Sequence, residues 1–264
     1  MLAILSPAKS LDYESKLATK KFSLPEFVPE SKQLITRLRK FAPQDLSNLM
    51  GISDNLAELN HRRYAEWQPE FAPDLGSKKA RPAILAFKGD VYLGLQGETL
   101  SERDFTWAQK HVRILSGLHG LLKPLDQIRP YRLEMGTRLA TNKGDNLYEF
   151  WGDKITDALN QALVAQQSSK ESQPILINLA SNEYFNAVNA KKLNARVINV
   201  HFREMKNGQY KFLSFFAKKA RGTMARYMID NRVKSLSALK AFDYDDYRYN
   251  PTLSKGDEWV FTRG

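Results

Sequence analysis

The chain has 264 residues, which fits one large domain or two small ones. Its apolar content of 42% excludes a disordered protein, and the absence of cysteine excludes disulfides, thiolate metal sites and a cysteine nucleophile. The net charge of +11 indicates a polyanionic partner, which could be DNA, RNA or a phosphorylated small molecule.

Apolar runs and turn residues predict an alternation of strands and helices along the chain. Buried strands are expected at 2–6, 83–87, 175–180, 196–202, 210–215 and 259–261. Helices are expected at 29–40, from about 43, and at 53–67, 101–115, 145–167 and 217–234. Asn207-Gly208 is a strong signal for a hairpin turn. We therefore expect an α/β fold with a mixed sheet surrounded by helices, as one compact unit over 1–264 with 29–68 as a possible helical subdomain.

Most of the excess charge lies in one segment. Residues 191–234 hold twelve Lys or Arg but only two acids, Glu204 and Asp230, a net charge of +10. The predicted helix at 217–234 lies inside this segment. Its periodicity places Lys218, Lys219 and Arg226 around the bare Gly222, while Ala220, Met224 and Met228 face a core.

We therefore expect Lys218, Lys219 and Arg226 to line a basic cleft, with Arg221 less central. The alternative is a solvated surface helix.

Three loops that follow predicted buried strands carry polar side chains: 6–9, 88–90 and 181–183. In open α/β sheets, ligand sites gather beyond the carboxyl ends of the strands. If the strands are parallel neighbours, one group of side chains should meet there: Lys9, Lys88, Asp90, Ser181 and Glu183, joined by Arg132 and Glu134. The alternative is that each loop merely ends its strand in polar residues.

The stretch Gly117-Leu118-His119-Gly120 places two glycines between apolar flanks. It is similar to a helix-hairpin-helix element, in which backbone N–H groups of a glycine turn hold a DNA phosphate. Gly117, Gly120 and the nearby Lys123 would then be phosphate contacts. The turn is one residue longer than the usual pattern and Pro124 delays a second helix, so a simple packing turn is the alternative.

Neither a metal site nor a cofactor is predicted. The four histidines are scattered, and the Glu58–His61 spacing of di-iron bundles occurs once where two copies are needed. Nucleotide-binding glycine motifs and the nucleophile elbow are absent from the sequence. Because no apolar run reaches the ~18 residues of a membrane span and the N-terminus does not read as a signal peptide, we expect a cytoplasmic protein with no membrane partner.

Eight motifs together resemble the YaaA-type peroxide stress family: SPAKSLD (6–12), FKGDVY (87–92), LSGLHG (115–120), PLD (124–126), PYRLEMG (130–136), WGD (151–153), NLASNEY (178–184) and AKKARG (217–222). The resemblance implies a bacterial cytoplasmic protein that protects the cell during peroxide stress by limiting free iron. It also implies an α/β fold with a basic cleft and a helix-hairpin-helix-like element associated with duplex and distorted DNA.

Two functions are compatible with these features. The first is a non-enzymatic, monomeric protein that binds DNA through Lys218, Lys219, Arg221 and Arg226, with a smaller part for Lys123. The second is an enzyme on a nucleotide or another phosphorylated small molecule, with the phosphate held by Lys9, Lys88, Arg132 and Lys219. Asp90, Glu134 or Glu183 would then transfer protons. Direct iron binding ranks last because the sequence lacks cysteines and its histidines are scattered.

Overall fold

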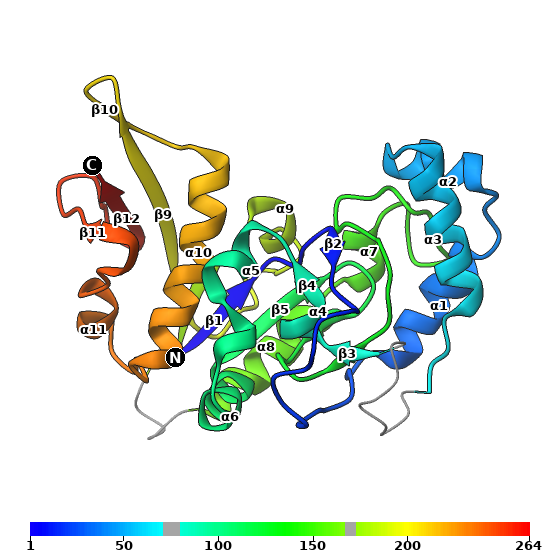
Figure 1. Cartoon of the computed structure of the whole chain (residues 1–264), viewed down its shortest axis with the longest axis horizontal. Helices are drawn as coiled ribbons and strands as arrows, with labels where there is room; N and C mark the ends of the chain where they lie inside the picture. Colours follow the sequence, from blue (N-terminus) through cyan, green and yellow to red (C-terminus); the bar gives the residue numbers. More distant parts are fainter. Residues whose placement is uncertain (71–79, 167–172) are drawn as a thin grey trace.

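The computed structural model describes residues 1–70, 80–166 and 173–264 (Figure 1). Its centre is a mixed sheet in the order β11-β12-β9-β8-β1-β5-β6, with β10 paired to β9. The strands are β1 Leu2–Leu5, β5 Val112–Ser116, β6 Gly120–Leu122, β8 Ile175–Leu179, β9 Arg196–Lys206, β10 Gln209–Lys211, β11 Arg248–Tyr249 and β12 Glu258–Arg263. The predicted α/β class with a mixed sheet is confirmed.

The strands β5, β1, β8, β9 and β12 run parallel to their neighbours, whereas β6, β10 and β11 pair antiparallel at the margins. In the centre, Leu5 at the end of β1 lies opposite both Ile114 and Leu179. All four residues of β1 are fully buried, as expected for an apolar strand covered on both faces. The carboxyl ends of β5, β1 and β8 therefore meet at one edge of the sheet.

Helices surround this sheet, and two short ladders extend the structure: β2 Ser10–Leu11 with β4 Phe87–Lys88, and β3 Arg81–Pro82 with β7 Gln127–Ile128. The helices are α1 Val28–Leu38, α2 Pro43–Met50, α3 Asp54–Glu66, α4 Ala83–Ala86, α5 Asp90–Leu95, α6 Glu102–His111, α7 Leu147–Trp151, α8 Lys154–Val164, α9 Asn182–Phe185, α10 Ser214–Asp230 and α11 Leu236–Lys240, with 3-10 turns η1 Gly97–Thr99 and η2 Tyr244–Asp246. Among the described residues, none of these helices is both long and apolar enough to span a bilayer.

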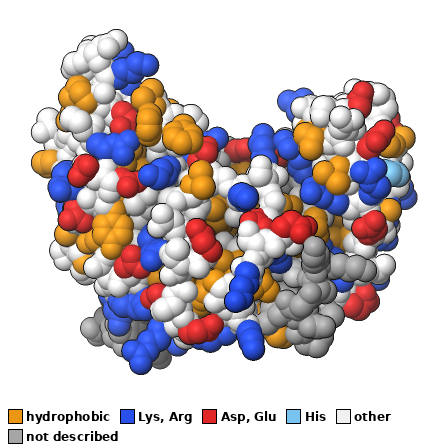
Figure 2. Space-filling view, viewed as in Figure 1, with side chains coloured by type: hydrophobic (Ala, Val, Ile, Leu, Met, Phe, Trp, Pro, Cys, Tyr) orange, Lys and Arg blue, Asp and Glu red, His pale blue; other side chains and the backbone are white. Residues whose placement is uncertain are grey.

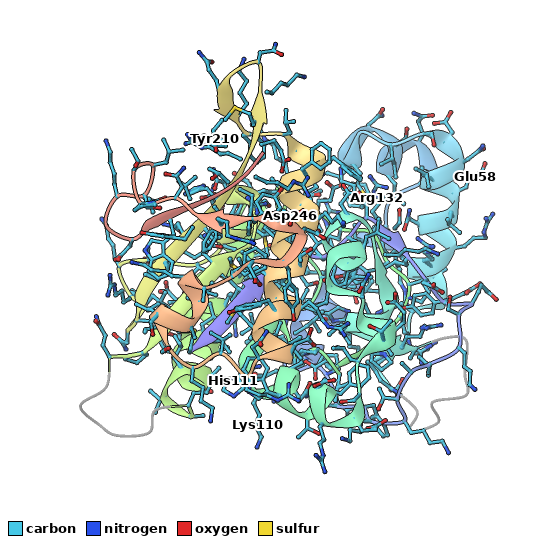
Figure 3. All side chains as sticks on the ribbon, turned by 60° about the vertical axis from the view of Figure 1, so that its left-hand side comes forward. Glu58, Lys110, His111, Arg132, Tyr210 and Asp246 are labelled. Atoms are coloured by element: carbon cyan, nitrogen blue, oxygen red, sulfur yellow. The ribbon has the colours of Figure 1, made fainter. Side chains whose placement is uncertain are left out.

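Two arms rise from opposite ends of the molecule. One contains α1, α2 and α3, and the other contains the β9–β10 hairpin with the first turns of α10 (Figure 1). In the rotated view, Tyr210 marks the tip side of the hairpin arm and Glu58 marks α3 on the other arm, while Arg132 lies between them (Figure 3). The hairpin turn follows the prediction, since Asn207 and Gly208 have φ angles of 54° and 73°.

The helices α5 and α10 cross in backbone contact because both carry a glycine at the crossing. A Cβ atom on Gly222 would lie 1.7 Å from the Val91 carbonyl oxygen, and one on Gly94 would lie 2.0 Å from the Lys219 carbonyl oxygen. Gly222 is therefore buried under α5. The prediction that it forms an open floor for a ligand is wrong, because its missing side chain admits another helix instead.

Four predicted elements need correction. Residues 83–86 form the short helix α4 rather than a strand, because the Ala83 and Ile84 N–H groups donate to Asp126 and Pro124 carbonyl oxygens at 2.9 Å instead of to the sheet. The helix expected at 101–115 ends at His111, and the buried run after it forms β5. The helix expected at 145–167 breaks at Gly152, whose φ is 49°. The strand expected at 210–215 stops at Lys211, and α10 begins at Ser214.

The predicted helix-hairpin-helix at 115–125 is wrong, because strands flank the turn. Ser116 pairs with Gly120 in the antiparallel ladder of β5 and β6. A Cβ atom on Gly117 would lie 2.3 Å from the Leu133 carbonyl oxygen, and one on Gly120 would lie 2.7 Å from the Trp151 ring. Both glycines are buried, so they cannot contact a DNA phosphate, and the turn serves packing.

A helical hairpin with a glycine turn does occur at α2–Gly51–α3. Gly51 adopts the left-handed conformation with φ 59°, and no atom lies within 4 Å of a Cβ built on it. The turn is therefore open to the surroundings. The sequence signals for it were the glycine between two predicted helices and the Ser53 that precedes α3.

Candidate functional site

A charged pocket of about 340 Å³ lies beyond the carboxyl ends of β1 and β8. The molecule is hollowed between the two arms (Figure 2), and Arg132, which lines the pocket, lies between these arms (Figure 3). Five cations and three carboxylates line it, a net formal charge of +2: Lys9, Lys88, Arg132, Lys218, Arg221, Asp90, Glu134 and Glu183. The predicted meeting of the strand-end loops is therefore confirmed, although Lys88 follows α4 and not a strand of the main sheet.

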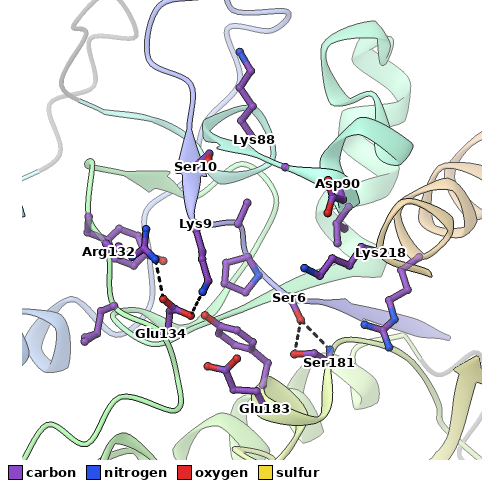
Figure 4. A pocket seen from close by; sticks show the side chains of 18 residues that line it. Ser6, Lys9, Ser10, Lys88, Asp90, Arg132, Glu134, Ser181, Glu183 and Lys218 are labelled. Carbon is purple, nitrogen blue, oxygen red and sulfur yellow. Dashed lines mark hydrogen bonds and ion pairs between the residues drawn. The ribbon is translucent and has the colours of Figure 1, made fainter. Parts of the chain in front are cut away.

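Hydrogen bonds hold the loops after β1 and β8 together. The Ser181 N–H donates to Ser6 Oγ at 2.9 Å, and the Ser6 hydroxyl donates to Ser181 Oγ at 3.3 Å. The pairing of Ser10 with Lys88 in the β2–β4 ladder then places Lys9 beside the loop at 88–90. Backbone pairing thus collects side chains that are far apart in the sequence (Figure 4).

The segment at 131–135, which follows β7, forms another wall of the pocket, and its residues alternate between buried and half-buried. Tyr131, Leu133 and Met135 are buried, while Arg132 and Glu134 are half-buried and line the pocket beside the strand-end loops, as we expected for these two residues. The Tyr131 hydroxyl lies 2.6 Å from Ser116 Oγ at the end of β5, which fixes the segment against the sheet.

Three of the five cations are already engaged by carboxylates. Lys9 Nζ lies 2.7 Å from Glu134 Oε2, and an Arg132 nitrogen lies 3.2 Å from Glu134 Oε1. Lys88 Nζ lies 3.6 Å from Asp12. The Ser15 N–H bond to Asp12 holds the pKa of that carboxyl well below its usual range, with help from the Ser15 hydroxyl, the Glu14 N–H and nearby Arg81. Asp12 therefore stays ionised beside Lys88.

Lys218 and Arg221 differ from these three cations. Within residues 1–70, 80–166 and 173–264, neither forms an ion pair or a side-chain hydrogen bond. Lys218 extends from α10 into the pocket towards Ser6 (Figure 4). Arg221 is partly buried, and this burial lowers the pKa of its guanidinium, which nevertheless stays charged at neutral pH. Two cations thus face the pocket without a counter-charge in the described chain.

The carboxylates of the pocket also differ in their engagement. Glu183 Oε1 accepts a hydrogen bond of 3.0 Å from the Gly136 N–H, and Glu134 is bound to Lys9 and Arg132. Asp90 forms neither an ion pair nor a side-chain hydrogen bond with any part of the chain that the structure describes. It lies on the same side of the pocket as Lys218 (Figure 4).

The basic residues of α10 divide between two faces, and the predicted division is wrong. Lys219 faces away from the pocket and pairs with Asp245 at 3.0 Å, and Arg226 pairs with Asp230 at 2.8 Å. Arg221, which we expected to be least central, lines the pocket instead. The reason is that Gly222 must face α5, and this contact sets the rotation of α10 about its axis.

The positive charge of the segment 191–234 is partly offset in the folded protein by acids from other parts of the chain. Five of its twelve cations pair with acids, four of them with acids from elsewhere in the chain: Lys192 with Asp153, Arg196 with Asp257, Lys219 with Asp245, Arg232 with Asp104 and, within the segment, Arg226 with Asp230. Lys123 lies outside the pocket, in the loop where its N–H donates to Asp126 at 2.7 Å.

His119 lies beneath the pocket wall and is fully buried, with its ring edge against Tyr131. Burial lowers the pKa of His119 to about 3, so the ring is neutral at neutral pH. Its Nδ1 lies 3.0 Å from Ser31 Oγ. No group of three or more His, Asp or Glu side chains that could hold a metal ion occurs among the described residues, and His119 is a packing residue.

The comparisons place these residues in a family. A family model described as "Peroxide stress protein YaaA" matches residues 1–253. The chain belongs to the YaaA peroxide stress family. A relative from Colwellia psychrerythraea, named "UPF0246 protein", is 52% identical over 263 residues, which cover 100% of this chain and 99% of that protein. Membership of the YaaA family supports a role in peroxide stress.

Proposed function

We propose that this YaaA family protein binds DNA without sequence specificity in the hollow between its arms, and that it thereby helps to limit damage from free intracellular iron. The observation that carries this proposal is the pair of cations on the floor of the hollow, Lys218 and Arg221, that form no ion pair with the described chain. Phosphate contacts of this kind are independent of base sequence.

Both arms can extend the contact along a nucleic acid. On the hairpin arm, Lys206 and Lys211 are exposed near the β9–β10 turn. On the other arm, the open Gly51 turn leads into α3, a helix of 13 residues whose first N–H groups attract a phosphate, while the carboxylate of Asp54 in its first turn repels one. A duplex lying across the hollow would thus meet basic side chains on one wall and a helix start on the other.

A titration of duplex DNA at two salt concentrations tests the binding. Affinity should fall by orders of magnitude between about 50 and about 200 mM salt if several phosphates are contacted. Replacing Lys218 and Arg221 by Gln should reduce the slope of log affinity against log salt by about 2, since one unit is lost for each phosphate contact. Lys219→Gln is the matched control, because Lys219 lies on the other face of α10 and pairs with Asp245. Absence of binding at low salt would refute the proposal.

Protection can be measured on supercoiled plasmid exposed to ferrous iron and hydrogen peroxide. If DNA binding protects, the wild-type protein should slow nicking at low salt, and the Lys218, Arg221 double variant should protect less. Equal protection by the double variant would show that the effect does not depend on binding in the hollow.

The volume of the pocket favours a second candidate function. A volume of about 340 Å³ falls at the lower end of the range of small-molecule sites, ~300–1,000 Å³. An enzyme on a phosphorylated small molecule could use Asp90, Glu134 or Glu183 for proton transfer. Thermal-shift screening of phosphorylated compounds tests this candidate, and no stabilisation by any of them would exclude it.

A further inference from the structure

The pocket is too small for a duplex but large enough for one nucleotide. Its volume of about 340 Å³ is bounded by four chain segments, at 6–10, 88–91, 131–134 and 181–184, and by α10. A double helix crossing the hollow can place at most a single group or a strand end inside it. The question is therefore which chemical group the pocket selects.

The charges of the pocket match a phosphate monoester. A monoester carries about −1.5 to −2 charges at pH 7, whereas an internal phosphodiester carries about −1. The lining side chains carry a net formal charge of +2, or +1 when Asp12, the partner of Lys88, is counted, and Lys218 and Arg221 are the two lining cations without an ion-pair partner in the described structure. Arg221 in addition is partly buried, where a guanidinium gains most from a doubly charged, bidentate partner.

The remaining polar groups indicate a nucleotide rather than bare phosphate. Asp90 offers a carboxylate that accepts hydrogen bonds, and no donor of the described chain occupies it. The hydroxyl of Ser6 donates to Ser181 Oγ at the junction of the two loops, and the Ser181 hydroxyl keeps its own proton for a ligand. A ligand that combines a phosphate with sugar hydroxyls or base amino groups would satisfy both kinds of group.

We propose that the pocket binds a nucleotide through its phosphate monoester, with Lys218 and Arg221 as the phosphate contacts and Asp90 as an acceptor for the ligand's hydroxyl or amino group. The nucleotide is either free or the phosphorylated end of a broken DNA strand. This inference deepens the proposed function and rests on it for the assignment of the pocket to phosphate.

The experiment compares ligands that differ in one phosphate. Binding of AMP, adenosine and the methyl ester of AMP is measured by calorimetry at pH 7.5. AMP should bind at least about tenfold more tightly than adenosine, because a charge-assisted contact contributes ~1.5–3 kcal/mol. The methyl ester, a phosphodiester, should bind less tightly than AMP. Arg221→Gln and Lys218→Gln should each weaken AMP binding by about tenfold or more, while Lys219→Gln should change it less than about threefold.

A second experiment identifies the source of the nucleotide. Duplexes with 5′-phosphate and with 5′-hydroxyl ends are titrated by fluorescence anisotropy. A preference for the phosphorylated end that Arg221→Gln removes assigns the site to DNA ends, and AMP selectivity without such a preference assigns it to a free nucleotide. Both results support the proposal. The 5′-hydroxyl duplex has no terminal phosphate, so its affinity measures DNA binding in the hollow without the pocket. Loss of that binding would contradict the proposed function, whereas loss of the preference for the phosphorylated end would contradict only the nucleotide site.

The proposal is overturned if AMP and adenosine bind equally or neither binds, and the two duplexes are not distinguished. It is also overturned if Lys219→Gln weakens AMP binding as much as Arg221→Gln does. Should Arg221→Gln fail to fold, Lys218→Gln carries the test, because Lys218 is exposed and forms no ion pair or side-chain hydrogen bond with the described residues.

Discussion

Replacing Gly222 by Ala tests whether α5 and α10 cross in backbone contact. The added Cβ atom would lie 1.7 Å from the Val91 carbonyl oxygen, where an ordinary contact is about 3.4 Å. The neighbour is backbone, so no side chain can turn away. The helices must separate by more than about 1 Å, and overpacking of this kind costs ~1–3 kcal/mol or more.

A clash this close with backbone belongs at the upper end of that range, ~3 kcal/mol. The higher helix propensity of Ala offsets ~1 kcal/mol of it, so the net loss should be about 2 kcal/mol. In a chain of this size the melting temperature should fall by ~4–8 °C. Thermal unfolding followed by circular dichroism measures it. Lys218→Ala is the control, since an exposed position on the same helix should change stability by less than about 0.5 kcal/mol. A Gly222→Ala protein as stable as the wild type would refute the reasoning.

Three further predictions concern buried or structural groups. The pKa of His119 is ~6.5 in the unfolded chain but about 3 in the folded protein, so protonation of the unfolded chain lowers the free energy of unfolding as the pH falls below ~6.5. Between pH 7 and pH 5 this loss amounts to ~2 kcal/mol, and His119→Phe should remove it. Urea unfolding at both pH values measures the difference. Gly120→Ala should cost ~2–3 kcal/mol in the same assay, because Gly120 has φ 64° and faces the Trp151 ring. Arg226→Ala should cost ~1–3 kcal/mol and leave AMP binding unchanged, because Arg226 ties α10 to the carbonyl of Gln96 and not to the pocket.

Each of these predictions has a result that would contradict it. An identical pH dependence of His119→Phe and wild-type stability would show that folding does not lower the pKa of the ring. A fully stable Gly120→Ala protein would mean that the Trp151 ring can move aside without cost. Weaker AMP binding by Arg226→Ala at unchanged stability would place Arg226 in the ligand site after all.

The sequence predicted secondary structure correctly where the local residue pattern fits only one kind of element. The central strands β1 and β8 are apolar runs, and Asn207-Gly208 permits the left-handed turn that joins β9 to β10. Local patterns failed at 83–86 and at 112–116, where a short buried run fits a helix or a strand equally well. Residues distant in sequence decided between helix and strand there, because Ala83 and Ile84 hydrogen-bond to the loop at 124–126 and β5 pairs with β1. The glycines at 117 and 120 resembled a phosphate-binding turn because a buried packing turn requires the same residues.

The charged residues show the same division between sequence and tertiary structure. The sequence alone determined which polar loops follow the buried strands, and the parallel order of β1 and β8 brought them to one edge. It also determined how far each side chain of α10 is rotated from the next about the helix axis. Only the tertiary structure decided which face of α10 meets the pocket, because the contact of Gly222 with α5 fixes the rotation of the helix. The same rotation sends Lys219 to Asp245 and leaves Arg221 facing the pocket, since a helical period gives relative directions but no absolute one.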